Sequence, residues 1–191
     1  MEKSERKIIL AVTGASGSVY ALKLLDFLRK IKDPPAETAV IFSDNGKEIW
    51  KYENGRDYEA FPPEKEYDSR DFHAPFASGS SDYDTMIICP ASMGILGRIA
   101  SGSSDDLIAR AADVMLKEKR KLIVVPRETP YNLVHVRNME TILLAGGIVC
   151  PASPSFYSRP GNIDDLVMTV VERIVSLAGF DAPLHRWMKN G

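Results

Sequence analysis

Positive side chains, small residues and one tyrosine gather in the stretch from residue 89 to residue 159. Its three segments read CPASMGILGRIASG, LIARAADVMLKEKRKLIVVPRETP and PASPSFYSRP, so that Arg and Lys stand close to Pro, Ser and Gly where apolar runs end. An ordinary solvated surface would instead scatter Arg and Lys among Glu. We therefore interpret this stretch as part of an anion-binding site.

A second candidate for anion binding directly follows the first apolar run, KIILAVTG. The turn TGASG, residues 13 to 17, opens a predicted helix, and the free backbone N–H groups and the dipole at a helix start favour a phosphate. A tight turn that needs glycine and binds nothing explains the same residues equally well. The turn is neither GxGxxG nor a P-loop, which disfavours a dinucleotide and a nucleoside triphosphate, so a mononucleotide phosphate fits better.

Two further serine-bearing turns follow later strands. Ser43 ends the second predicted strand, and Ser92 begins the turn SMGI, residues 92 to 95, after the third. Ligands of open α/β sheets bind beyond the carboxyl ends of the strands, so three such turns on one sheet edge indicate a site more strongly than any one of them. Ser92 by itself is better explained as a helix N-cap.

The predicted helix 105–119 carries two cations at a defined spacing. Arg110 and Lys117 are seven residues apart, which places them on one helix face and about 10 Å apart. Two simpler roles stay open at this point. Arg110 can pair with Asp113, and Lys117 can complement the dipole at the end of the helix.

Other candidate residues lie further along the chain. Arg127 and Glu128 directly follow the apolar run KLIVVP, and the glutamate is either half of a turn ion pair or a general acid near a leaving anion. Tyr157 lies in a polar, aromatic turn. Arg173 lies on the last predicted helix, where by itself it is a solvated arginine.

Composition excludes several classes of protein. The chain has 191 residues, which suits one domain, 1–191, and its formal net charge is -2, so no global basic field favours nucleic acid or an anionic membrane. The two cysteines, Cys89 and Cys150, indicate reduced thiols, and the apolar run near the N-terminus is too short for a signal peptide or a membrane span. Because the three histidines are isolated, we expect no metal centre, and we expect a cytoplasmic protein.

Short apolar runs alternate with helical patterns along the whole chain, which is typical of βα units around a parallel sheet. We predict an α/β, Rossmann-like three-layer fold with a mostly parallel sheet. The segment 53–84 is expected to be irregular, either a binding loop or an interface element. The predicted strands are 7–14, 38–43, 85–90, 121–126 and 147–151, and the predicted helices are 17–31, 44–52, 93–101, 105–119, 132–145 and 163–178.

Four motifs give the chain a resemblance to a known family. GASGSVY, CPAS, the block LIARAADVMLKEKRKLIVVPRETP and the run PSFYSRP with its later DDLV resemble the flavin prenyltransferases, the UbiX-like proteins once labelled aromatic acid decarboxylases. The resemblance covers nearly the whole chain. It implies a homo-oligomer, usually a dodecamer, that transfers a dimethylallyl group from dimethylallyl monophosphate to N5 and C6 of reduced FMN without a metal. The prenylated FMN would then pass to a UbiD-like decarboxylase.

The resemblance also implies roles for particular residues. FMN would be bound by Gly14, Ala15, Ser16, Ser43, Ser92, Met93, Gly94, Ile95 and Arg127. The dimethylallyl phosphate would be bound by Tyr157, Arg173, Lys117 and Arg110, and the catalytic residues would be Glu128, Lys117, Ser16 and Tyr157. By the same resemblance, Phe72 would lean on the allyl group.

Two other functions remain open from the sequence. FMN-dependent cysteine decarboxylases share the nucleotide-binding fold, but they carry a PxSANT-like turn where this chain has CPASMG, and they have no obvious use for Lys117, Glu128 and Tyr157. A non-catalytic FMN carrier would not need the intact set of cations. Residues Met93 to Ile95 form a turn that is more often polar in the flavin prenyltransferases. This difference bears on the affinity for flavin and not on the type of reaction.

Overall fold

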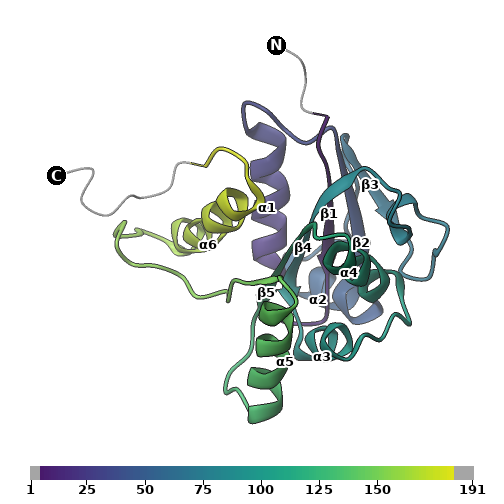
Figure 1. The fold of residues 1–191 in the computed structure, drawn as a ribbon. Coiled ribbons are helices and arrows are strands. Elements are labelled where there is room, and N and C mark those ends of the chain that lie inside the picture. Colours follow the sequence, from purple (N-terminus) through teal and green to yellow (C-terminus); the bar gives the residue numbers. More distant parts are fainter. Residues whose placement is uncertain (1–4, 183–191) are drawn as a thin grey trace.

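A computed structural model describes residues 5–182 as one parallel sheet covered by helices on both faces (Figure 1). The six strands have the order β3-β2-β1-β4-β5-β6, and every neighbouring pair is parallel. The α/β prediction is confirmed. The strands are β1 (Lys7–Val12), β2 (Glu37–Phe42), β3 (Glu64–Tyr67), β4 (Tyr83–Ala91), β5 (Lys121–Pro126) and β6 (Ile148–Val149), and the helices are α1 (Ser18–Lys30), α2 (Asp44–Asn54), η1 (Pro75–Ala77), α3 (Met93–Ser101), α4 (Leu107–Lys117), α5 (Leu133–Leu144) and α6 (Ile163–Ala178).

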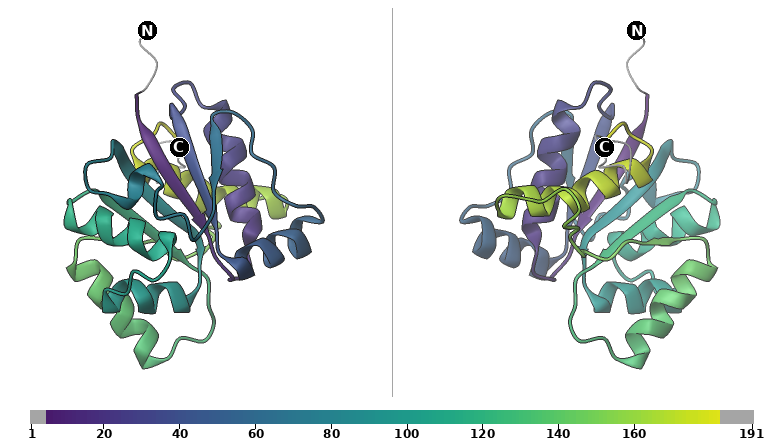
Figure 2. Two further views of the ribbon diagram at one scale, coloured as in Figure 1. Left: turned by 90° about the vertical axis from the view of Figure 1, so that its right-hand side faces the viewer. Right: turned by 90° about the vertical axis from the view of Figure 1, so that its left-hand side faces the viewer.

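The two faces of the sheet bury two separate hydrophobic cores. In β1, Ile8 and Leu10 pack with α1, α2 and α6, whereas Ile9 and Ala11 pack with α3, α4, α5 and η1. All four side chains are fully buried, as expected for a central strand whose successive residues point to opposite faces. The two helical layers are visible in the turned views of Figure 2. This is the three-layer arrangement that the alternation of runs predicts.

One strand falls where an irregular segment was predicted. Within 53–84, residues 64–67 form β3 and pair with β2 at the edge of the sheet, and η1 follows, so the prediction is wrong for both stretches. The sequence of β3, EKEY, lacks the apolar alternation of a strand because two of its side chains face solvent. Glu64 instead anchors the strand: its carboxylate, 2% exposed, accepts hydrogen bonds from Arg29 at 2.5 Å and from the hydroxyl of Tyr58 at 2.7 Å.

The remaining differences from the predicted elements are small, the largest being β6. A strand was predicted at 147–151, but β6 spans only Ile148–Val149. Beyond it, the N–H groups of Cys150 and Ala152 still donate to the β5 carbonyl oxygens of Val124 and Pro126. Both cysteines are free thiols. None of the helices within residues 5–182 is long and apolar enough to cross a membrane. The same residues contain no cluster of three potential metal ligands.

Candidate functional site

A large cavity, about 690 Å³, lies beyond the carboxyl ends of the first four strands of the chain. Its centre is at β1 and β4, where the strand order changes direction, and such a switch point is the usual ligand site of an open α/β sheet. All three serine- or glycine-bearing turns of the sequence therefore meet at one place, as predicted. The cavity is lined by Thr13, Gly14, Ser43, Asp44, Asn45, Ser69, Arg70, Phe72, Ser92, Gly94, Ile95, Arg98, Asp105 and Asp106.

Thr13 joins the two central strands at the floor of this cavity. Its hydroxyl donates to the carbonyl oxygen of Pro90 at 2.8 Å and accepts from the backbone N–H of Ser92 at the same distance. Because Thr13 is only 2% exposed, these bonds are shielded from water and hold the ends of β1 and β4 together. The turns that follow both strands are thus fixed before any ligand binds.

Two helices begin at the cavity with serine caps. Ser43 accepts a hydrogen bond from Gly46 N–H at 3.0 Å at the start of α2, and Ser92 accepts one from Ile95 N–H at 3.4 Å at the start of α3. The interpretation of Ser92 as an N-cap is confirmed. Gly46 is required here, since a Cβ on it would lie 2.4 Å from the carbonyl oxygen of Val12. Both helix starts direct positive dipole ends toward the cavity.

The start of α1, predicted to bind a phosphate, already holds a carboxylate. Glu53 accepts hydrogen bonds from Gly17 N–H at 3.0 Å and from the N–H and hydroxyl of Ser18, both at 2.7 Å. The phosphate prediction is therefore wrong for these two N–H groups, because an anion from the chain itself occupies them. Partial burial raises the pKa of Glu53, but hydrogen bonds from Ser16, Ser18 and Gly17 outweigh it and lower the pKa below its ordinary value.

Glu53 is the residue that sequence reasoning missed. It lies one residue past the predicted end of the second helix, and no motif links it to the turn 13–17. The only signal for it was indirect: a helix start with a glycine N-cap and no acidic residue in its first turn leaves N–H groups that something must satisfy.

We expect Glu53→Gln to lower the free energy of unfolding at pH 7 by about 1 kcal/mol, because charged hydrogen bonds become neutral at a largely exposed site. A carboxylate whose pKa is lowered on folding stabilises the protein above its ordinary value of 4.5, and this contribution disappears as the pH falls through the folded pKa. Urea denaturation should therefore show a difference at pH 7 that shrinks at pH 3.5. An equal difference at both pH values would contradict this role.

Arg127 and Glu128 directly follow β5, at the same carboxyl edge of the sheet as the large cavity. The Nε of Arg127 donates to the carbonyl oxygen of Ser16 at 2.9 Å, which ties the end of β5 to the turn after β1. Glu128 accepts only a hydrogen bond from the next residue's N–H, Thr129, at 2.9 Å. Among residues 5–182 it forms no ion pair, so the alternative of a turn ion pair with Arg127 does not hold and its carboxylate is available to a ligand.

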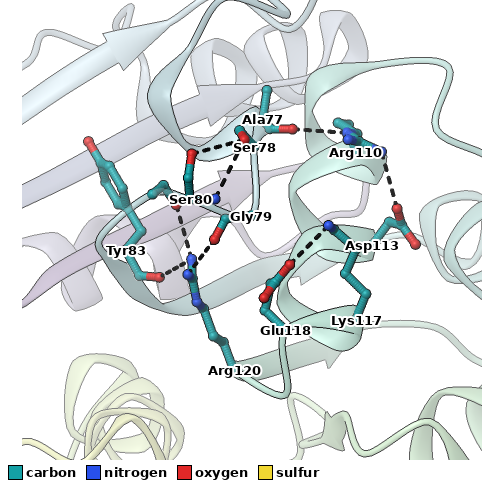
Figure 3. Close-up of polar contacts among 11 residues, drawn as sticks. Ala77, Ser78, Gly79, Ser80, Tyr83, Arg110, Asp113, Lys117, Glu118 and Arg120 are labelled. Carbon is teal, nitrogen blue, oxygen red and sulfur yellow. Dashed lines mark hydrogen bonds and ion pairs between the residues drawn. The ribbon is translucent and has the colours of Figure 1, made fainter.

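Arg110 and Lys117 do not line this cavity. Figure 3 shows both side chains on α4, together with the polar contacts of the neighbouring segment. As predicted they share one face of α4, which packs along the segment 77–83: Arg110 donates to the carbonyl oxygen of Ala77 at 3.0 Å and pairs with Asp113 at 3.4 Å. Lys117 pairs with Glu118 at 2.9 Å. The helix starts at the cavity, but Lys117 ends it about 15 Å further on, where the chain is about to enter β5.

The last two predicted residues lie on a different part of the chain. Tyr157 is 69% exposed in the turn before α6, and Arg173 lines a smaller cavity of about 260 Å³ next to that segment. Neither lines the large cavity. A single chain thus brings five of the predicted residues together in the wall of the large cavity: Gly14, Ser43, Ser92, Gly94 and Ile95. Ala15 and Met93 are buried beside them, and the carbonyl oxygen of Ser16 is bonded to Arg127. The wall does not include four other predicted residues: Arg110, Lys117, Tyr157 and Arg173.

The large cavity also contains residues that no motif indicated. Arg98 is held by Asp105 at 3.0 Å and by Asp106 at 2.5 Å, and Asp106 also caps α4. Phe72, which the resemblance places against the allyl group, is 48% exposed and lines the cavity.

Comparisons with known proteins agree with this geometry. The model of the flavoprotein family matches residues 1–176. The flavin prenyltransferase UbiX of Methanocaldococcus jannaschii is 41% identical over 184 residues, which are 95% of this chain and 98% of that relative.

Solved structures give the same result. AnUbiX (PadA1), solved with FMN and dimethylallyl pyrophosphate, is 38% identical and superposes with a TM-score of 0.87, covering 98% of this chain and 99% of that one. The dodecameric FMN-dependent UbiX-like decarboxylase of Escherichia coli O157:H7 is 35% identical, with a TM-score of 0.87 and coverage of 95% and 99%. The FMN-dependent cysteine decarboxylase TvaF, at 15% identity and a TM-score of 0.60, shares the fold alone.

Proposed function

Because this chain belongs to the flavin prenyltransferases of the flavoprotein family, we propose that it transfers a dimethylallyl group from dimethylallyl monophosphate to reduced FMN. The observation that carries the proposal is the 41% identity over 98% of the length of a flavin prenyltransferase, together with a cavity at the switch point of the sheet. The FMN-dependent cysteine decarboxylases TvaF and SpaF are each 15% identical, which supports only a common fold. The test is whether the chain converts reduced FMN to a prenylated flavin.

The large cavity has the donor set that FMN needs. The capped starts of α2 and α3 supply N–H groups and dipoles for the phosphate, and Asn45 and Ser43 add polar side chains. In the flavin prenyltransferases, the turn at 93–95 more often contacts FMN through polar side chains. In this chain the turn is Met-Gly-Ile, so backbone groups replace some of these contacts. We assign FMN binding to Gly14, Ala15, Ser16, Ser43, Ser92, Met93, Gly94, Ile95 and Arg127.

Reduced FMN supplies the N5 and C6 atoms that accept the prenyl group. The residues of the chain act on the donor: the allylic C–O bond breaks, the phosphate leaves as an anion, and positive charge builds on the allyl carbon. Arginine and lysine donors fixed on that phosphate stabilise the departing charge, so the step needs no metal. We assign this role to Arg110, Lys117 and Arg173, with the hydroxyl of Tyr157 as a further donor.

We assign the transfer of a proton to Glu128. Its carboxylate lies at the carboxyl edge, beside the arginine that holds Ser16, and it carries no ion pair within residues 5–182. It can therefore exchange a proton with the flavin ring or with the released phosphate. We also assign an influence on the proton at N5 to Ser16, whose hydroxyl adjoins Glu53.

The complete site requires more than one copy of the chain. Lys117 lies at the edge of the sheet opposite to Glu128, and β5 between them spans about 20 Å. A neighbouring copy must therefore bring Lys117 to the cavity if both act on one donor. This supports a homo-oligomer, and we propose a dodecamer like that of the Escherichia coli relative.

The product requires a recipient. A prenylated FMN has no further use in a transferase, so we propose that it passes to a UbiD-like decarboxylase. We also propose a cytoplasmic location, in keeping with free thiols at Cys89 and Cys150.

A further inference from the structure

Lys117 forms an ion pair with the residue that follows it in the chain. Its Nζ donates to Oε1 of Glu118 at 2.9 Å, and the two side chains are 47% and 37% exposed. The same hydrogen bond lowers the pKa of Glu118 below its ordinary value, so the carboxylate is charged at pH 7. Because an exposed ion pair by itself adds little to stability, the role of this one depends on what surrounds it.

Gly79 forms the surface behind the ion pair. A Cβ built on Gly79 would lie 2.2 Å from Oε1 of Glu118 and 3.0 Å from Nζ of Lys117, so both charged groups lie against its backbone. The carboxylate is the nearer of the two and lies on the Gly79 side of the ammonium (Figure 3). A lysine ammonium has three N–H donors, and within residues 5–182 Glu118 accepts from one of them. The other two can therefore donate to an anion on the side away from Gly79.

Two arginines fix the segment 77–83, which carries Gly79, against α4. Arg110 donates to the carbonyl oxygen of Ala77 at 3.0 Å. Arg120 donates to the carbonyl oxygens of Gly79 at 2.7 Å and of Tyr83 at 3.1 Å. The segment cannot move away from α4 without losing these charged hydrogen bonds, so Gly79 is a fixed surface for the ion pair.

We propose that Glu118 is a positioning residue, which holds the ammonium of Lys117 in place for the donor phosphate bound by a neighbouring copy. A lysine ammonium sits on a flexible four-carbon stem, and fixing that stem costs conformational entropy. Contact with Glu118 orders the stem before the donor arrives, so the ammonium is ready to stabilise the charge that develops as the phosphate leaves. Glu118 contacts neither donor nor flavin in this role, and it forms and breaks no covalent bond. The inference rests on the proposed function, in which Lys117 binds the donor phosphate.

A double-mutant cycle on the ion pair tests this role. Formation of prenylated FMN from dimethylallyl monophosphate is measured anaerobically for the unaltered chain, Glu118→Ala, Lys117→Ala and the double variant. We expect Glu118→Ala to lower kcat about tenfold and to change KM for the donor less than about threefold, because the other proposed donors still bind the phosphate. In the Lys117→Ala background the same change should have no further effect, since no ammonium remains to be positioned.

Gly79→Ala tests the surface behind the ion pair without removing a charge. The added methyl group would overlap the carboxylate of Glu118, which is the far end of a flexible side chain and can be displaced. We expect a loss of kcat similar to that of Glu118→Ala. Glu140→Ala, which removes a carboxylate from the exposed side of α5, is the control and should keep the kcat of the unaltered chain.

Flavin absorbance and gel filtration separate positioning from a structural role. Every variant should bind FMN and form oligomers as the unaltered chain does. Loss of FMN or of the oligomer in Glu118→Ala, or an equal slowing with and without Lys117, would show that Glu118 supports the fold and would overturn the proposal. Unchanged kcat in both Glu118→Ala and Gly79→Ala would overturn it as well. An unaltered chain that forms no product would overturn the proposed function, and this inference with it.

Discussion

Glu128→Gln is expected to slow formation of prenylated FMN by about 100-fold or more while FMN still binds. A positioned proton carrier typically contributes at least this factor, and a glutamine keeps the shape of the side chain but cannot exchange a proton. The only hydrogen bond that Glu128 makes within residues 5–182 is to Thr129 N–H, and an amide oxygen can accept it equally well. The variant should therefore fold and bind FMN normally, as measured by flavin absorbance of the purified protein.

The matched control for this change is Glu140→Gln on the exposed side of α5, which removes the same charge without touching the proposed site. Its turnover should equal that of the unaltered chain. If Glu128→Gln turned over at the same rate as this control, Glu128 would have no part in proton transfer.

Lys117→Ala is expected to reduce turnover by about 100-fold, because it removes one fixed donor from the departing phosphate. Coexpression with Glu128→Gln should then restore activity. In a mixed oligomer, a site that joins the intact Lys117 of one copy to the intact Glu128 of another arises by random pairing in about a quarter of cases. Two nearly inactive chains would thus give an active mixture.

The restoration follows from the position of the two residues at opposite ends of β5, which prevents one chain from placing both in one site. Lys32→Ala, which removes an exposed lysine from the loop after α1, is the control and should leave turnover unchanged. An inactive mixture of the two variants, with oligomers of normal size, would show that Lys117 and Glu128 do not act together across copies.

The fold was predictable because most strands of this sheet are buried on both faces. The run KIILAV is apolar throughout, and its residues divide between the two cores in strict alternation. β3 could not be predicted in this way. Its four residues include three charged ones, and what holds it in place is Glu64, whose partners Arg29 and Tyr58 come from other segments.

The candidate site was predictable where it depends on strand ends. Gly14, Ser43 and Ser92 each follow a strand, so knowing the parallel sheet was enough to bring them together. Glu53 was not predictable, because its contact with Ser18 joins residues 35 positions apart through the packing of α1 against α2.

The spacing of Arg110 and Lys117 correctly predicted a common helix face, but not where that face lies. Spacing along a helix does not tell which end of the sheet the helix approaches. The direction of α4, from the cavity toward the start of β5, decides that Lys117 is distant from the cavity of its own chain.

Prenylation of a flavin by this chain can be measured directly. Purified protein would be incubated without oxygen with reduced FMN and dimethylallyl monophosphate, and the extracted flavin would be analysed by mass spectrometry, with a sample lacking the donor as the control. We predict a flavin heavier by one C5H8 unit that appears only when the donor is present. FMN that binds to the protein but is recovered unmodified would contradict prenyl transfer and would favour a cysteine decarboxylase or a flavin carrier.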